Sequence, residues 1–320
     1  MLPWGVMSGI RPAKTFRQFK ERGKSYDEVK KIVKDIYDVS DEKCNLAVKV
    51  AENEEKILKR VKDNSVSLYI GIPFCPSRCL YCSFVSTDIK YSGKYMDEFS
   101  DLMCTEIEKT GQILKRLGFF VQNIYIGGGT PTTLSEDNLT KIFKSLQKNI
   151  DFSNIDEFTL EAGRPDTKTM EKMRIAKEYG VSRISINPQT MNDETLNIIG
   201  RKHTTEMFLK AFEIARNAGF DNINTDLIAG LPGENFEMFK NSIDRICMLN
   251  PENITVHSMC VKRAARLRFS EMELTGYREM NKMLSYAQEI MRECGKEPYE
   301  YIKRYDEILQ KKVEIAEYFE

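Results

Sequence analysis

The sequence predicts an α/β protein built as a partial (β/α)6 barrel, with an N-terminal helical segment and a short C-terminal helix. From residue 66 onward, short β-rich runs alternate with helical stretches, which favours parallel strands joined by right-handed crossovers. Glycine-rich or polar residues follow the ends of these runs, where both a barrel and an open doubly wound sheet place their sites. Six strand–helix units are too few for a closed eight-fold barrel, so a barrel built from them would be partial. An open doubly wound sheet is the alternative.

The elements can be placed along the chain from the spacing of apolar residues. Residues 1–65 form the helical segment, with helices predicted over 24–39 and 41–62. Residues 66–299 form the barrel, and residues 300–320 are predicted to form one amphipathic helix. The predicted strands are 66–72, 121–127, 156–162, 181–187, 221–228 and 253–259. The predicted barrel helices lie near 93–117, 135–148, 167–179, 204–218, 235–248 and 271–294.

Composition excludes several classes of protein. Hydrophobic residues make up 41% and charged residues 30%, which excludes a disordered or collagen-like chain. No apolar run approaches the ~20 residues of a membrane helix, and the N-terminus does not resemble a signal peptide. The 48 basic residues balance 48 acidic ones, so no nucleic-acid or anionic-membrane partner is expected. Eight cysteines without a secretory signal predict a reducing compartment, the cytoplasm.

The strongest chemical signal is a Cys-x3-Cys-x2-Cys loop, Cys75, Cys79 and Cys82, directly after the first predicted strand. Three thiolates leave a four-coordinate zinc ion one ligand short. On a four-iron cluster, three thiolates leave one iron open to a further ligand. Three unrelated cysteines or a partial zinc site remain the alternatives, and four other cysteines are predicted to be structural: Cys44, Cys104, Cys247 and Cys294.

These residues resemble the radical S-adenosylmethionine (SAM) superfamily. Four segments together resemble its oxygen-independent coproporphyrinogen III oxidase (coproporphyrinogen dehydrogenase) family: 69–75 (YIGIPFC), 127–132 (GGGTPT), 200–204 (GRKHT) and 226–233 (DLIAGLPG). Two more, 163–166 (GRPD) and 186–192 (INPQTMN), are most similar to the HemZ-type branch of that family. The resemblance extends over about residues 1–299.

The resemblance implies a fold, two cofactors and an activity. The three cysteines would bind a 4Fe-4S cluster whose fourth iron chelates SAM, and reductive cleavage of SAM would yield a 5′-deoxyadenosyl radical. That radical would start the oxidative decarboxylation of two propionates of coproporphyrinogen III to vinyl groups, giving protoporphyrinogen IX in haem biosynthesis. The electron would come from a flavodoxin- or ferredoxin-type donor, and whether one or two SAM molecules bind stays open.

Ten residues are candidates for contact with SAM. Glycines after the second strand permit close backbone approach, and a threonine hydroxyl can bind a carboxylate or an amine. Tyr81 lies between two cluster ligands, and the remaining assignments follow the resemblance. The alternatives are a core aromatic for Tyr69, an ordinary turn for the glycines and a solvated strand-end charge for Glu161. The ten residues are Tyr69, Tyr81, Gly128, Gly129, Thr130, Glu161, Gln189, Arg201, Asp226 and Cys260.

Three of these positions and one histidine carry a further expectation. Asp226 stands in an apolar strand, where a charge is costly unless it is paired. Arg201 is an available partner, so a purely structural ion pair is the alternative to SAM binding. Cys260 differs from the residue type that the family pattern has at that place. His257 is predicted to be a hydrogen-bonded core histidine.

The basic run 262–268 (KRAARLR) follows the sixth strand. The substrate that the family implies carries four carboxylates, which guanidinium groups bind well, so Arg263 and Arg266 are the candidate substrate-binding residues. A solvated basic turn is the alternative.

The sequence also departs from the family. Phe84 stands where some members carry a fourth cysteine, a departure shared with relatives that bind haem without making it. A haem-binding chaperone on the same barrel is therefore the second functional prediction. An RNA-modifying radical SAM enzyme is the third, which the balanced charge disfavours. After residues 297–299 the chain no longer follows the family pattern, which predicts incomplete closure over the substrate.

Overall fold

The computed structural model describes residues 4–7, 12–167, 169–270 and 272–298. Within these ranges the chain forms two compact units, which are described separately. One is a helical unit, formed by the described residues up to Asp63 together with Glu297 and Pro298. The other unit spans Asn64–Lys296. The predicted helix over 300–320 lies outside the described residues.

The helical unit contains α1 (Pro12–Glu21), α2 (Tyr26–Tyr37) and α3 (Asp41–Leu58), so the helices predicted over 24–39 and 41–62 are confirmed. Ser25 begins α2 with a capping box, in which its hydroxyl accepts from the N–H of Glu28. The apolar faces of the helices enclose a separate core. That core includes Phe16, Val29, Val33, Ala47 and Ala51.

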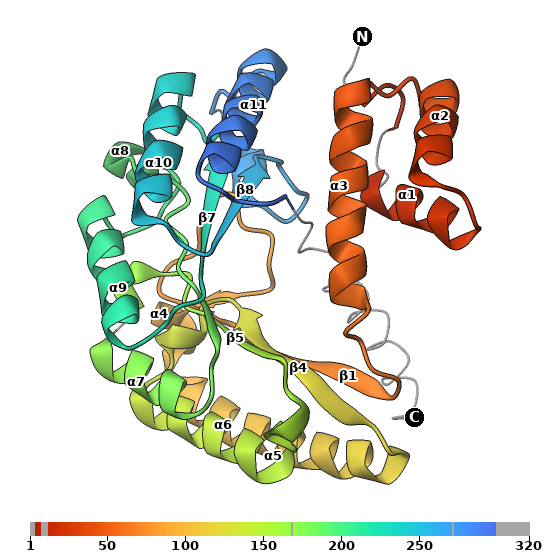
Figure 1. The fold of residues 1–320 in the computed structure, drawn as a ribbon. Helices are drawn as coiled ribbons and strands as arrows, with labels where there is room; N and C mark the ends of the chain where they lie inside the picture. The colour runs from red at the N-terminus through yellow and green to blue at the C-terminus, as the bar shows by residue number, and fades with distance from the viewer. Residues whose placement is uncertain (1–3, 8–11, 168, 271, 299–320) are drawn as a thin grey trace. The chain divides into compact units, whose positions relative to one another are not determined.

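The larger unit is built on six parallel strands: β1 (Ser65–Ile72), β4 (Phe120–Gly128), β5 (Glu157–Glu161), β6 (Arg183–Ser185), β7 (Ile223–Ala229) and β8 (Asn253–Ser258). All six predicted strands are thereby confirmed. The strands lie in chain order, β1-β4-β5-β6-β7-β8 (Figure 1). A doubly wound sheet reverses its order partway, so this sheet is a partial barrel rather than the alternative.

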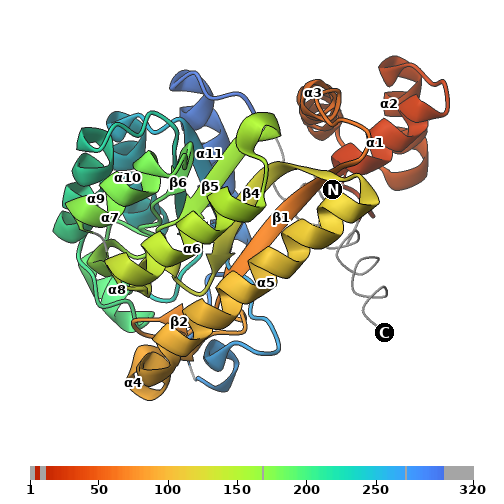
Figure 2. The same ribbon diagram turned by 90° about the horizontal axis from the view of Figure 1, so that it is seen from below.

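Helices follow the strands and cover the outer face of the sheet (Figure 2). Ser135 and Asn235 begin two of them, as predicted, by accepting hydrogen bonds from backbone N–H groups. The main helices are α5 (Met96–Leu117), α6 (Glu136–Asn149), α7 (Met170–Glu178), α9 (Thr205–Asn217), α10 (Phe236–Leu249) and α11 (Tyr277–Glu293).

Several short elements were not predicted. They are the parallel pair β2 (Phe74–Cys75) and β3 (Thr87–Asp88), the helices α4 (Ile89–Ser92) and α8 (Asp193–Ile198), and the 3-10 turns η1 (Gly93–Tyr95), η2 (Pro131–Thr133), η3 (Phe152–Asn154), η4 (Pro165–Thr167) and η5 (Arg266–Phe269). Most of them lie in loops that follow strands, and β2 carries the first cysteine of the Cys-x3-Cys-x2-Cys loop.

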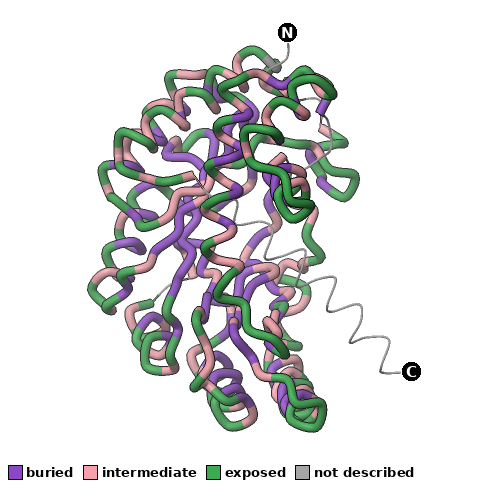
Figure 3. Tube along the Cα trace, turned by 45° about the vertical axis from the view of Figure 1, so that its right-hand side comes forward, coloured by how far each residue is buried: buried purple, intermediate pink, exposed green. Residues whose placement is uncertain are grey.

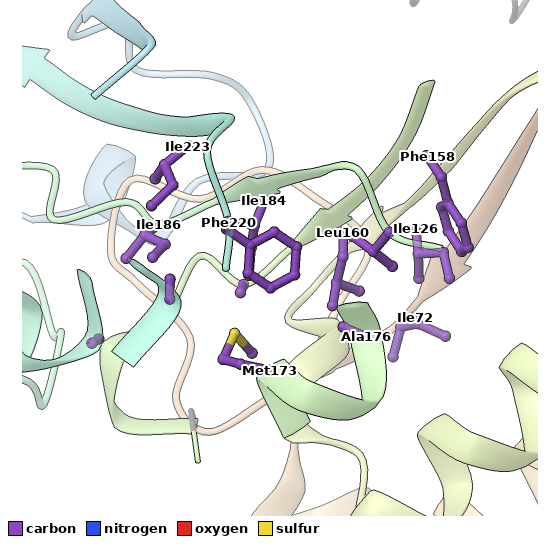
Figure 4. Packing of buried hydrophobic residues seen from close by; sticks show 14 of the residues in the cluster. Ile72, Ile126, Phe158, Leu160, Met173, Ala176, Ile184, Ile186, Phe220 and Ile223 are labelled. Atoms are coloured by element: carbon purple, nitrogen blue, oxygen red, sulfur yellow. The ribbon is translucent and has the colours of Figure 1, made fainter. Parts of the chain in front are cut away.

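The main core lies between the sheet and its helices, where Phe158, Leu160, Ile184 and Met173 pack together (Figure 4). Buried residues accordingly run along the strands, while the outer surfaces of the helices are exposed (Figure 3). Because side chains alternate along a strand, the β7 residues next to core-facing Leu227 point to the inner face. This alternation places Asp226 inside the barrel.

Candidate functional site

The cysteine loop, residues 75–82, is held by backbone and hydroxyl hydrogen bonds. The N–H of Leu80 donates to the carbonyl of Ile199 at 3.0 Å, and the hydroxyl of Ser77 donates to the carbonyl of Gly200 at 3.1 Å. Cys75 and Cys79 are buried, and Cys82 is partly exposed. All eight cysteines are free thiols.

The three thiols of the loop influence one another. Burial raises the pKa of Cys82, and the charges of Cys79 and Cys75 raise it further. Within the described residues, no three Cys, His, Asp or Glu side chains converge on a position for a single metal ion. A four-iron cluster does not require such convergence, because each thiolate binds a different iron atom.

The glycine turn at the end of β4 packs directly on the cysteine loop. The N–H of Gly129 donates to the carbonyl of Ile72 at 2.7 Å, and the hydroxyl of Thr130 donates to Sγ of Cys75 at 3.6 Å. A Cβ atom on Gly129 would lie 2.7 Å from the carbonyl oxygen of Phe74 and 3.0 Å from Sγ of Cys75. The space beside Cys75 therefore depends on glycine, which fits a bulky group bound at the thiols.

Glu161 ends β5 beside this turn. Its carboxylate accepts hydrogen bonds from the hydroxyl of Tyr125 at 2.7 Å and from the N–H of Gly128 at 3.2 Å. Burial raises its pKa to about 7, and the charge of Asp226 adds to the rise. Glu161 is thus an oriented carboxyl inside the barrel, not a solvated strand-end charge. Tyr69 stacks on Tyr125, with ring centroids 5.9 Å apart.

Arg201 is buried and faces the cysteine loop. It donates to the carbonyls of Gly163 and Asn187 at 2.6 and 2.7 Å and to the hydroxyl of Tyr81 at 3.3 Å. Burial, with the charge of Cys79, raises the pKa of Tyr81, so this phenol remains neutral. The alternative of an Arg201–Asp226 ion pair is wrong, because the guanidinium of Arg201 binds these two carbonyls and the hydroxyl of Tyr81 and not Asp226.

Asp226 has other partners on the inner face of the barrel. The amide of Asn224 donates to Oδ1 at 2.7 Å, and Nε2 of His257 lies 3.8 Å from Oδ2. The nearby carboxylate of Asp226 raises the pKa of His257. The prediction of a core histidine is wrong, because the side chain of His257 is 44% exposed. Strand alternation could have placed it on the inner face, in register two residues beyond the partner of Asp226.

The remaining candidates lie at the ends of β6 and β8. Gln189 is buried, and its backbone pairs with β7. Cys260, Arg263 and Arg266 are exposed. Their segment nevertheless meets the cysteine loop, since the guanidinium of Arg266 donates to the carbonyl of Arg78 and the N–H of Leu267 donates to the carbonyl of Leu80.

Arg164 was not predicted as a site residue, although it lies in the segment 163–166 that resembles the family. Arg164 is buried, forms an ion pair with Asp166 and donates to Sγ of Cys79 at 3.8 Å. The one signal available was an arginine two residues before an aspartate just after a strand. That pattern does not say which loop the arginine meets.

A partial barrel whose first strand leads into a three-cysteine loop, with a glycine turn packed on that loop, defines a class of iron–sulfur proteins that use SAM. The family model of the radical SAM superfamily matches residues 69–246. The chain belongs to the radical SAM superfamily. The superfamily implies a 4Fe-4S cluster and SAM, and the cysteine loop and glycine turn fit that pair.

Three known proteins illustrate what this chain is similar to. The oxygen-independent coproporphyrinogen-III oxidase-like protein HemZ of Bacillus subtilis is 38% identical over 96% of this chain and 62% of its own length. The haem chaperone HemW of the same organism is 39% identical over 61% of this chain and 51% of its own. The structure of coproporphyrinogen III oxidase (HemN) from Escherichia coli matches 76% of this chain and 56% of its own, with a TM-score of 0.66 and 25% identity. The chain thus spans about half to three-fifths of the length of these relatives.

None of the helices in the described ranges has the length and apolar character needed to cross a membrane.

Proposed function

We propose that this chain is a radical SAM oxidoreductase that converts two propionates of coproporphyrinogen III to vinyl groups in the cytoplasm. The observation that carries the proposal is the 38% identity with the HemZ oxidase-like protein over 96% of this chain. It is supported by the packing of the three-thiol loop on the glycine turn. A flavodoxin- or ferredoxin-type protein is the proposed electron donor.

In this proposal the chain's own residues bind and orient the reactants. Cys75, Cys79 and Cys82 hold the cluster, which supplies one electron for the cleavage of SAM. Gly129 leaves the space beside Cys75 that a bound group needs. Glu161, oriented by Tyr125, accepts hydrogen bonds from the ribose hydroxyls of SAM.

The substrate side of the proposal rests on charge. Each propionate loses one hydrogen atom to the 5′-deoxyadenosyl radical, one electron to an external one-electron acceptor, and carbon dioxide, which leaves a vinyl group. Arg263 and Arg266 are proposed to bind the substrate carboxylates, because they are exposed cations in a segment that meets the cysteine loop through Arg266. His257, next to Asp226, adds a further N–H group that can donate to a carboxylate inside the barrel.

The test is anaerobic reconstitution with iron and sulfide, followed by addition of SAM, dithionite and coproporphyrinogen III. We expect both 5′-deoxyadenosine and protoporphyrinogen IX, measured by chromatography. The Cys79→Ala variant serves as the control and should form neither product. A reconstituted wild-type protein that forms no 5′-deoxyadenosine would overturn the proposal.

A haem-binding chaperone is the second candidate. It is favoured by Phe84, which replaces the fourth cysteine of some family members, and by the 39% identity with HemW over 199 residues. Stoichiometric haem binding, together with no conversion of coproporphyrinogen III in the same preparation, would select this candidate over the oxidase.

A further inference from the structure

Arg164 follows β5, and its guanidinium is buried against the cysteine loop. Its side chain is 4% exposed. It donates to the carbonyl and the hydroxyl of Ser77 at 3.2 and 3.1 Å and to Sγ of Cys79 at 3.8 Å. Its Nε and Nη2 also lie 3.1 and 3.2 Å from the two carboxylate oxygens of Asp166. Arg164 therefore joins the end of β5 to the loop.

Arg201 approaches the same sulfur from the loop after α8, with Nη1 3.9 Å from Sγ of Cys79. The other two cysteines have no guanidinium group hydrogen-bonded to their sulfur in the described structure. Cys75 accepts from the hydroxyl of Thr130, while a backbone N–H at Phe84 and the charge of Arg78 act on Cys82. Cys79 is thus the one cysteine of the loop that lies between two guanidinium groups in the described structure.

The buried guanidinium groups of Arg164 and Arg201 stabilise negative charge on the sulfur of Cys79. Interactions between charges are strong where water is excluded, and hydrogen bonds to ligand sulfurs help to set the reduction potential of an iron–sulfur cluster. When a cluster takes up one electron, its net charge becomes more negative by one, and nearby cations stabilise that state. A nearby carboxylate such as Asp166 opposes the effect.

We propose that Arg164 is a positioning residue of the cluster site, which fixes Cys79 and raises the reduction potential of the cluster, while Asp166 offsets part of this effect. The inference rests on the proposed function, because it requires a cluster at the three cysteines. It assigns to Arg164 and Asp166 a role that is distinct from contact with SAM or substrate.

The sign of the shift distinguishes this role from a purely structural one. Arg164→Gln removes the positive charge and should lower the potential. Asp166→Asn leaves Arg164 unopposed and should raise it. Arg164→Lys keeps the charge and should stay near the wild type. If the ion pair only stabilised the fold, breaking it from either side would shift the potential in the same direction or not at all.

Arg183→Gln is the matched control. Arg183 is likewise buried, with its side chain 4% exposed, and it lies 3.8 Å from Glu157. It is the first residue of β6, at the end of the strand away from the loops that follow the strands. We expect this variant to lose stability without a change in the potential of the cluster.

The experiment is a dithionite titration of the reconstituted proteins with mediator dyes, in which the reduced cluster is followed by electron paramagnetic resonance. Iron and sulfide content and thermal unfolding are measured on the same preparations. At the wild-type midpoint we expect the ratio of reduced to oxidised cluster to be about tenfold lower in Arg164→Gln, or roughly 59 mV for one electron. Asp166→Asn should shift the ratio in the opposite direction.

Unchanged potentials in both variants, or shifts of the same sign, would overturn the inference while leaving the proposed function intact. If Arg164→Gln takes up no cluster, the sign of the shift in Asp166→Asn decides. A wild-type protein that takes up no oxygen-sensitive four-iron cluster would instead refute the proposed function itself.

Discussion

The cysteine loop and the basic run 262–268 contact each other, but the side chains around the loop are buried whereas those of the basic run are exposed. Around the loop, buried groups such as Thr130, Arg164 and Arg201 each make specific hydrogen bonds. In the basic run, Arg263 and Arg266 are exposed. The region proposed to bind the cofactors is therefore preorganised by hydrogen bonds, whereas the region proposed to bind the substrate is exposed. Substitutions should have large effects in the first region and small ones in the second.

The largest effect is expected for Cys79→Ala. Because three thiolates hold the cluster in the proposed site, removal of the buried middle one should abolish cluster uptake, measured as iron and sulfide per chain. Cys104→Ala is the control, since Cys104 lies on α5 and its thiol donates to the carbonyl of Lys141. Full cluster content in Cys79→Ala would contradict the ligand assignment.

Gly129→Ala tests whether the glycine turn must remain free of side chains. The added methyl group would lie 2.7 Å from the carbonyl oxygen of Phe74, so this carbonyl or the turn must shift. We expect a loss of about 1–3 kcal/mol in the unfolding free energy of the cluster-free protein, together with lower iron content. Gly163→Ala is the control, because its nearest neighbour would be an ordinary 3.4 Å away. Equal effects of the two variants would show that the turn tolerates a side chain.

Glu161→Ala should weaken SAM binding to the reconstituted protein by roughly ten- to hundredfold, since a hydrogen bond to a charged group contributes about 1.5–3 kcal/mol. Equilibrium dialysis with labelled SAM measures this change. Glu157→Gln, at the other end of the same strand, should leave the affinity unchanged. Wild-type affinity in Glu161→Ala would place the ribose elsewhere.

The stability of the cluster-free protein should also depend on pH, because the carboxyl of Glu161 is buried. The pKa of Glu161 rises from 4.5 to about 7 in the folded protein, so folding favours its protonated form. Its contribution to stability is complete below pH 4.5 and is lost as the pH rises through 7. Urea unfolding of the cluster-free protein should show that Glu161→Gln loses less stability than the wild type between pH 5 and 8, by about 2 kcal/mol.

Glu234 provides an independent check of that response. Burial raises its pKa to about 7 as well, and its carboxyl accepts a hydrogen bond from Thr190. Glu234→Gln should flatten the same pH profile. An unchanged profile in both Glu161→Gln and Glu234→Gln would contradict the assigned protonation of these two carboxyls.

The smallest effect is expected in the basic run. An exposed cation contributes at most about 1 kcal/mol to an ion pair, so Arg263→Ala should raise the KM for coproporphyrinogen III by up to about fivefold. SAM cleavage without substrate should not change. Lys144→Ala, an exposed residue on α6, is the control. A hundredfold effect would show that the basic run closes over the substrate and is not the open region described here.

The sequence predicted the strands and the approach of the glycine turn to the cysteine loop, because periodicity and topology alone place strand ends at one edge. It did not predict which polar groups pair there. Opposite charges made an Arg201–Asp226 ion pair the alternative to SAM binding, yet Arg201 binds the carbonyls of Gly163 and Asn187. The position of His257 in a strand predicts a core histidine, yet its side chain is 44% exposed. Such pairings depend on which face and which loop each side chain meets, and one sequence does not contain that information.

The order of the strands has a mechanical consequence. In the described structure β1 pairs only with β4, and β8 only with β7, so the sheet has two free edges. A closed barrel has a width fixed by its number of strands and their stagger. An open one can change its curvature through small changes of twist at each strand interface, without breaking a ladder. Changes confined to the interfaces of β6, β7 and β8 would widen or narrow the inner face around a large molecule. The cysteine loop, the glycine turn and Glu161, which lie at the ends of β1, β4 and β5, would then keep their mutual geometry.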